Sequence, residues 1–386
     1  MEDLGRRFPF ISQIILNNID NISLAKFREA SRENSNFLES ERFYWIRNLK
    51  KYSANFEEFQ KPWKKVINKT PVEFLKNLAI DAHIFFNGIS TRHNKQWHPL
   101  FIGAERGSLP LCKHVVERTG DINPKQIDGY TPLSLAAQEG HLEICGFLIK
   151  HLDDKNPAQN DGWTPLHSAA TGGHLEVYKL LFNHMDQKNP RNNIGRTPFH
   201  QAAQQGHLEV WLFMFNHLDQ KNPRDIKDWT PLHLACSNGH LEICKSMIMH
   251  LEDKHPAGYI GITPLHVAAY GGHLEIWKLL MKDLDNKNPG DNYGRTPLHG
   301  AAIKGHLGVS KEISQYLDDI NPSGHLGKTP LHYASYYGNL ELCEFISEKI
   351  EDLNPCTNDG KTPIYFANER NHRSIVSLLR LAQIKN

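Results

Sequence analysis

The chain has 386 residues, and its 44 lysines and arginines almost balance its 43 aspartates and glutamates, which gives a formal net charge of +1. This balance excludes the strong basic excess that is typical of proteins that bind nucleic acid. Residues 1–7 hold no apolar run of signal-peptide length and no later stretch approaches a membrane span, so we expect a cytoplasmic or nuclear protein with neither a membrane nor a nucleic acid as its partner.

The first 95 residues differ from the rest in charge and in pattern. They carry 16 basic and 11 acidic residues, a net charge of +5, whereas the remainder carries −4. Within residues 1–55, apolar residues recur at helical spacing from Ile11 to Ile19, again after Ser23, and again around Trp45. The pattern predicts a separate domain of three short helices.

The order of these residues resembles the F-box. The segments that carry the resemblance are Phe8-Pro9, Ile14-Ile15-Leu16, Ile19, Leu24, Ala30-Ser31-Arg32 and Trp45. Asn34 stands where the F-box usually has a tryptophan. The resemblance implies that residues 1–55 dock onto the Skp-type adaptor of a cullin-RING ubiquitin ligase, through Pro9, Ile11, Ile14, Ile15, Ile19, Leu24, Phe27 and Trp45. The alternative is that these helices only cap the repeat array that follows, because any such array needs its end covered.

Residues 56–96 are predicted to form a helical connector. Thr70-Pro71-Val72-Glu73 has the spacing of a capping box, in which the threonine and the glutamate satisfy backbone groups at a helix start. We expect this segment to pack the N-terminal domain onto the first repeat as its cap.

From residue 97 to the C-terminus, a Thr-Pro-hydrophobic signature recurs every 33 residues. The Thr-Pro pairs begin at Thr131, Thr164, Thr197, Thr230, Thr263, Thr296, Thr329 and Thr362. A degenerate further copy begins at His98. A period of this length predicts a solenoid of stacked units over residues 97–386.

One copy shows how each unit should fold. Gly162 suits a turn that needs a positive φ, Thr164 is a predicted N-cap, and Pro165 takes the first helical position. The first helix should end at Gly173, and the second should begin with His174-Leu175-Glu176 and bury Leu175, Leu180 and Leu181. An Asn-Pro pair then leads into a projecting finger loop.

These units resemble the ankyrin repeat. Its signature Thr-Pro-Leu-His-x-Ala is complete in the copies that begin at Thr164, Thr230, Thr263, Thr296 and Thr329. The resemblance implies an all-α solenoid of about nine helix-turn-helix units whose concave face binds other proteins.

The 23 histidines and six cysteines do not form a recognisable metal motif. Most histidines recur at fixed phases of the repeat, and no His-Glu-x-x-His or Cys-x-x-Cys spacing occurs, so we interpret them as structural hydrogen-bonding groups and expect no metal. Four cysteines share one phase of the second helix and should be reduced core residues. We find no phosphate loop, no nucleophile elbow and no kinase motif, and we expect no cofactor and no catalytic residues.

Positions that vary between otherwise similar repeats are free for partner binding. On the fingers and the exposed side of the first helix they carry tyrosine, tryptophan and arginine, which dominate interface hot spots. The predicted binding residues are Trp163, Arg196, Trp229, Tyr259, Tyr270, Tyr293, Arg295, Tyr333, Tyr336 and Tyr337.

Three functions are consistent with this pattern. The first is a non-catalytic adaptor that holds a protein substrate on the repeats and recruits a ubiquitin ligase through residues 1–55. The second is an ankyrin scaffold or inhibitor whose N-terminal helices are only a cap. The third and most remote is an enzyme whose site follows none of the motifs above.

Overall fold

The computed structural model describes residues 98–282 and 284–385. The predicted F-box-like domain of residues 1–55 and the predicted connector of residues 56–96 lie outside the described residues. The chain divides into two compact units, Met1–Asp153 and Asp154–Asn386, and each is considered by itself.

The described part of the first unit consists of two helix pairs. Their bounds are α6 Pro99–Arg106, α7 Leu109–Thr119, α8 Pro132–Glu139 and α9 Leu142–His151. The degenerate copy therefore does form a repeat: the backbone N–H of Leu100 donates to His98 Nδ1 at 3.3 Å, and His98 takes the capping role of the usual threonine.

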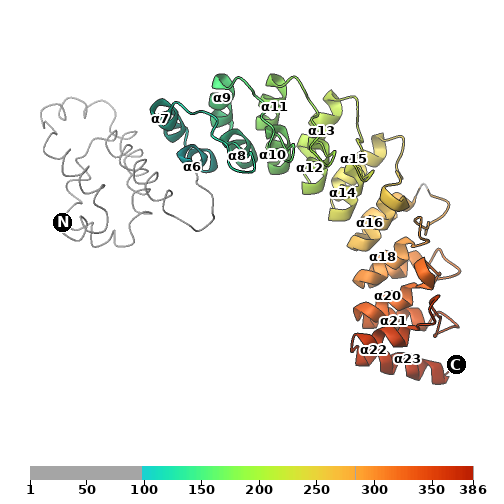
Figure 1. The fold of residues 1–386 in the computed structure, drawn as a ribbon. Coiled ribbons are helices and arrows are strands. Elements are labelled where there is room, and N and C mark those ends of the chain that lie inside the picture. The colour runs from blue at the N-terminus through green and yellow to red at the C-terminus, as the bar shows by residue number, and fades with distance from the viewer. Residues whose placement is uncertain (1–97, 283, 386) are drawn as a thin grey trace, which may run out of the picture. The chain divides into compact units, whose positions relative to one another are not determined.

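The second unit continues the same pairs (Figure 1). Its first helices are α10 Pro165–Gly172, α12 Pro198–Gln205, α14 Pro231–Asn238, α16 Pro264–Gly271, α18 Pro297–Lys304, α20 Pro330–Tyr337 and α22 Pro363–Glu369. Its second helices are α11 Leu175–His184, α13 Leu208–His217, α15 Leu241–His250, α17 Leu274–Met281, α19 Leu307–Ser314, α21 Leu340–Ser347 and α23 Arg373–Lys385. Two short 3₁₀ turns, η1 Tyr259–Gly261 and η2 His325–Gly327, lie in fingers. The described residues contain no strand, which confirms the all-α repeat architecture.

The first helices α10, α12, α14, α16, α18 and α20 begin and end as the sequence predicts. Thr164 and His167 form a capping box, in which His167 Nδ1 accepts the backbone N–H of Thr164 at 3.2 Å. Pro165 occupies the first turn, and Gly173 closes the helix with a left-handed φ of 75°. The same box recurs at Thr197, Thr230, Thr263, Thr296 and Thr329. Local sequence alone therefore sets the bounds of these helices.

The second helices bury one face against the first helices. On α11 the buried residues are Val177, Tyr178, Leu181 and Phe182. The prediction that Leu175 and Leu180 belong to the buried face was wrong, since both are only half-buried. At the phase of Tyr178, Trp211 and Trp277 have no exposed surface, and four cysteines fill the same place elsewhere. Those four cysteines, Cys112, Cys145, Cys244 and Cys343, are free and buried, as expected.

Two ladders of histidines join neighbouring repeats. In the first, His167 Nε2–H donates to the carbonyl of Arg196 in the next finger at 3.0 Å. In the second, His207 Nε2–H donates to the carbonyl of Thr171 in the preceding repeat at 2.8 Å. Burial lowers the pKa of His167, and also that of His200, His233 and His299, to about 4, so these rings are neutral when they donate. The structural interpretation of these histidines is confirmed.

Most fingers in the second unit are closed by a polar side chain at their base. Asp225 Oδ1, for example, accepts the backbone N–H groups of Lys227 and Trp229 at 2.8 and 2.9 Å. The fingers with η1 and η2 have Gly258 and Gly324 at that position. In them Ile260 and Leu326 adopt φ values of 55° and 56°, a region that bulky side chains rarely occupy.

Candidate protein-binding surface

The first helices of the second unit line one exposed surface together with their fingers. Within residues 154–386, Figure 1 shows the first helices along the inner side of a curved row and the second helices along its outer side. We call this inner surface, formed by the exposed side of α10, α12, α14, α16, α18, α20 and α22 and their fingers, the concave face. All ten residues predicted from the repeat to bind a partner lie in these helices and fingers.

At the N-terminal end of the concave face, the predicted binding residues already make contacts within the fold. The ring of Trp163 lies over the His167 ring with centroids 5.3 Å apart, and Trp229 covers His233 in the same way. Arg196 Nε donates to Asp225 Oδ2 at 3.2 Å. These three side chains, Trp163, Trp229 and Arg196, are half-buried and stabilise the neighbouring finger.

Toward the C-terminal end, tyrosines are more exposed. The exposed fractions are 60% for Tyr259, 43% for Tyr270, 46% for Tyr293 and 51% for Tyr337, whereas Tyr333 and Tyr336 are half-buried. Burial raises the pKa of Tyr333. These tyrosines lie on α16, on α20 and in the fingers that precede α16 and α18, so exposed aromatic rings gather in this part of the concave face.

Cationic side chains lie over several of these rings. Lys304 Nζ is 4.9 Å from the centroid of the Tyr270 ring, and the guanidinium of Arg370 is 4.2 Å from that of Tyr336. Lys328 Nζ lies 5.9 Å from the Tyr333 ring. Such contacts hold the lysine and arginine stems against the aromatic surface while their charge stays available.

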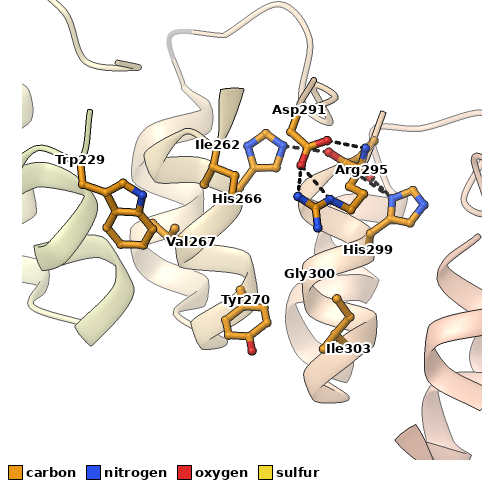
Figure 2. A pocket seen from close by; sticks show the side chains of 11 residues that line it. Trp229, Ile262, His266, Val267, Tyr270, Asp291, Arg295, His299, Gly300 and Ile303 are labelled. Atoms are coloured by element: carbon orange, nitrogen blue, oxygen red, sulfur yellow. Dashed lines mark hydrogen bonds and ion pairs between the residues drawn. The ribbon is translucent and has the colours of Figure 1, made fainter. Parts of the chain in front are cut away.

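A pocket of about 250 Å³ lies between α16 and α18 (Figure 2). Its walls include Val267 and Tyr270 from α16 and Gly300 and Ile303 from α18. The fingers add Trp229, Ile262, Asp291 and Arg295, and the other polar residues are His266, His299 and the N-cap residue Thr296. The pocket therefore brings together predicted binding residues from three repeats.

Sequence reasoning missed several residues of this surface. Gly300 and Ile303 line the pocket, Lys304 lies over Tyr270 at its rim, and Lys328 lies one finger further along, yet none of these four was predicted. The signal was present, because each occupies a phase at which other repeats carry different residue types. The sequence prediction selected only tyrosine, tryptophan and arginine, so it did not include glycine, isoleucine or lysine at these phases.

The part of the chain that the structure describes holds no group of three histidine, cysteine, aspartate or glutamate side chains placed to bind a metal. Nor is any helix among residues 98–282 and 284–385 both long and apolar enough to cross a membrane. The concave face presents aromatic rings, cations and the apolar pocket between α16 and α18.

Comparison with known families agrees with the repeat architecture. A family model that describes three copies of the ankyrin repeat matches residues 70–159, 100–193, 185–257, 249–323 and 310–386. A search of curated proteins gave no match. The F-box resemblance of residues 1–55 lies outside the matched residues and stays a prediction. Because the matched segments together span residues 70–386, the chain belongs to the ankyrin-repeat family.

Proposed function

We propose that this chain is a non-catalytic adaptor whose concave face holds a partner protein. The observation that carries the proposal is the row of exposed and half-buried tyrosines from Tyr270 to Tyr337, several of which have a cation over the ring. These side chains do not fill the core, whereas aromatic residues and arginine contribute most of the binding energy in protein interfaces. Ankyrin repeats bind protein partners generally, which supports the same conclusion.

Affinity capture with quantitative mass spectrometry tests this function. The full chain is compared with the double variant Tyr270→Ala/Tyr336→Ala and with Tyr316→Ala. Tyr316 is a matched control because it is 46% exposed but follows the second helix α19. We expect the double variant to lose the captured partner and Tyr316→Ala to keep it. Equal capture by all three proteins would refute the proposal.

The finer proposal is that residues 1–55 recruit the Skp-type adaptor of a cullin-RING ligase, so that the partner becomes a ubiquitylation substrate. Its support is the F-box resemblance of the sequence around Pro9, Ile15 and Trp45. Such an adaptor would act by raising the local concentration of ligase and substrate.

Co-purification of the full chain with a Skp-type adaptor tests the finer proposal separately. We expect Ile15→Asp to abolish capture, while Ile384→Asp, at a position that is 80% exposed on α23, leaves capture unchanged. If the wild-type chain captures no Skp-type adaptor, the N-terminal helices act as a cap and the chain is a scaffold or inhibitor.

A further inference from the structure

The pocket between α16 and α18 exists because one repeat lacks a side chain. At the phase of Gly300, the other repeats of the second unit carry Ser168, Gln201, Leu234, Val267, Tyr333 and Phe366. A Cβ atom at Gly300 would lie 3.4 Å from Tyr270 Cβ, which is ordinary van der Waals contact. A larger side chain at this phase would therefore fit the helix and occupy the pocket.

The walls of the pocket are mainly apolar. Trp229, Ile262, Val267, Tyr270 and Ile303 supply most of the lining. A volume of about 250 Å³ exceeds that of an engineered cavity of roughly 150 Å³ known to bind benzene. A branched aliphatic or aromatic side chain therefore fits this space.

The charged groups and the imidazoles of the lining already have partners within the fold. Arg295 forms an ion pair with Asp291 at 2.7 Å, which neutralises both charges, as Figure 2 shows. His266 Nε2 pairs with the carbonyl of Arg295 at 3.1 Å, and His299 Nε2 with that of Lys328 at 3.1 Å. A charged side chain in the pocket would find no partner there, so an apolar one is favoured.

The surroundings of the pocket are positively charged. Lys304 lies over Tyr270 at the rim, and Lys328, in the next finger, lies 5.9 Å from the Tyr333 ring and 5.1 Å from the Phe366 ring. Neither lysine forms an ion pair within the described residues. Arg370 adds a third cation further along, beside the exposed Glu369. The excess of cations that begins at the pocket rim and continues along the concave face toward α22 complements carboxylates on an extended segment of a partner.

We propose that this pocket receives one bulky apolar side chain from an acidic segment of the partner protein, with carboxylates of that segment beside Lys304 and Lys328. The proposal rests on the proposed function and adds the chemistry of the bound segment. The apolar side chain would supply affinity as it loses contact with water, and the charges would set the direction and position of the segment.

Selection from a displayed library of random twelve-residue peptides on the full chain tests this proposal. We expect enriched peptides to carry net negative charge and one leucine, isoleucine, phenylalanine or tryptophan at a constant distance from the acidic residues. Enrichment of neutral or basic peptides, or no enrichment, would overturn the proposal.

The affinity of the enriched peptides for variants of the chain, measured by fluorescence anisotropy, then shows where the peptides bind. Gly300→Leu fills the pocket with the residue that Leu234 places at the same phase, and it should weaken binding at least about tenfold while the thermal unfolding midpoint stays equal or rises. Lys304→Glu/Lys328→Glu should weaken binding similarly. The matched charge reversal Lys113→Glu/Lys150→Glu, on the second helices α7 and α9, should leave peptide binding unchanged.

The outcomes separate this inference from the proposed function. Peptides that resist Gly300→Leu but are lost with Tyr270→Ala/Tyr336→Ala would refute the pocket and leave the concave face as the binding surface. Peptides that resist all of these variants would contradict both.

Discussion

The buried histidine ladder predicts that the repeats lose stability in mild acid. Burial lowers the pKa of His167, His200, His233 and His299 to about 4 in the folded chain, whereas an unfolded histidine titrates near 6.5. Well above pH 6.5 these histidines are neutral in both the folded and the unfolded chain, and pH does not change the free energy of unfolding through them. Between pH 6.5 and about 4 the unfolded chain binds protons that the folded chain cannot accept, so the free energy of unfolding falls as the pH falls.

The size of the effect follows from the two pKa values. At pH 5 a histidine shifted from 6.5 to about 4 lowers the free energy of unfolding by roughly 2 kcal/mol, and the four together by roughly 8 kcal/mol if they act independently. Urea unfolding followed by circular dichroism at pH 7.5 and pH 5 measures this loss. His299→Gln, which can keep hydrogen bonds to Thr296 and Lys328, should reduce the pH dependence. A urea midpoint that stays constant or rises toward pH 5 would refute the argument.

Three further predictions concern the core, a finger and the thiols. Trp211→Ala removes a fully buried ring whose centroid lies 5.0 Å from that of Phe215. Urea titrations should show that the free energy of unfolding falls by about 3–5 kcal/mol. A loss below about 1 kcal/mol would contradict the packing. Ile260→Asn places a residue that tolerates positive φ at the strained finger position and should raise the free energy of unfolding by about 1 kcal/mol. A free energy of unfolding equal to or below that of the wild-type chain would show that Ile260 is not strained. Ellman's reagent should label only Cys356 rapidly in the folded chain and all six cysteines after denaturation, and rapid labelling of further thiols would indicate that the repeats open.

The elements that sequence predicted well depend on local chemistry. A threonine, a proline and a histidine at fixed spacing define the start of α10, α12, α14, α16, α18 and α20, and a glycine defines the end of each, so both could be derived without knowledge of the fold. The period of 33 residues then determined how the units follow one another.

The pocket depends on distant contacts and could not be derived in that way. Gly300 matters because Trp229 and Tyr270 from preceding repeats surround the space it leaves. The burial of α11 was misjudged for a similar reason: Leu175 and Leu180 have helical spacing compatible with a core face, yet Tyr178 and Phe182 take the buried positions. The positive φ of Ile260 occurs in a finger that has Gly258 in place of a capping side chain, and this local geometry is visible only in the structure.

Site-specific photo-crosslinking tests most directly whether the concave face binds the partner. A photoreactive phenylalanine analogue is introduced at Tyr337, on α20, or at Tyr316, after α19, which are 51% and 46% exposed. We predict that the captured partner becomes crosslinked from position 337 and not from position 316. Crosslinks from position 316 alone would contradict the assignment of the concave face as the binding surface.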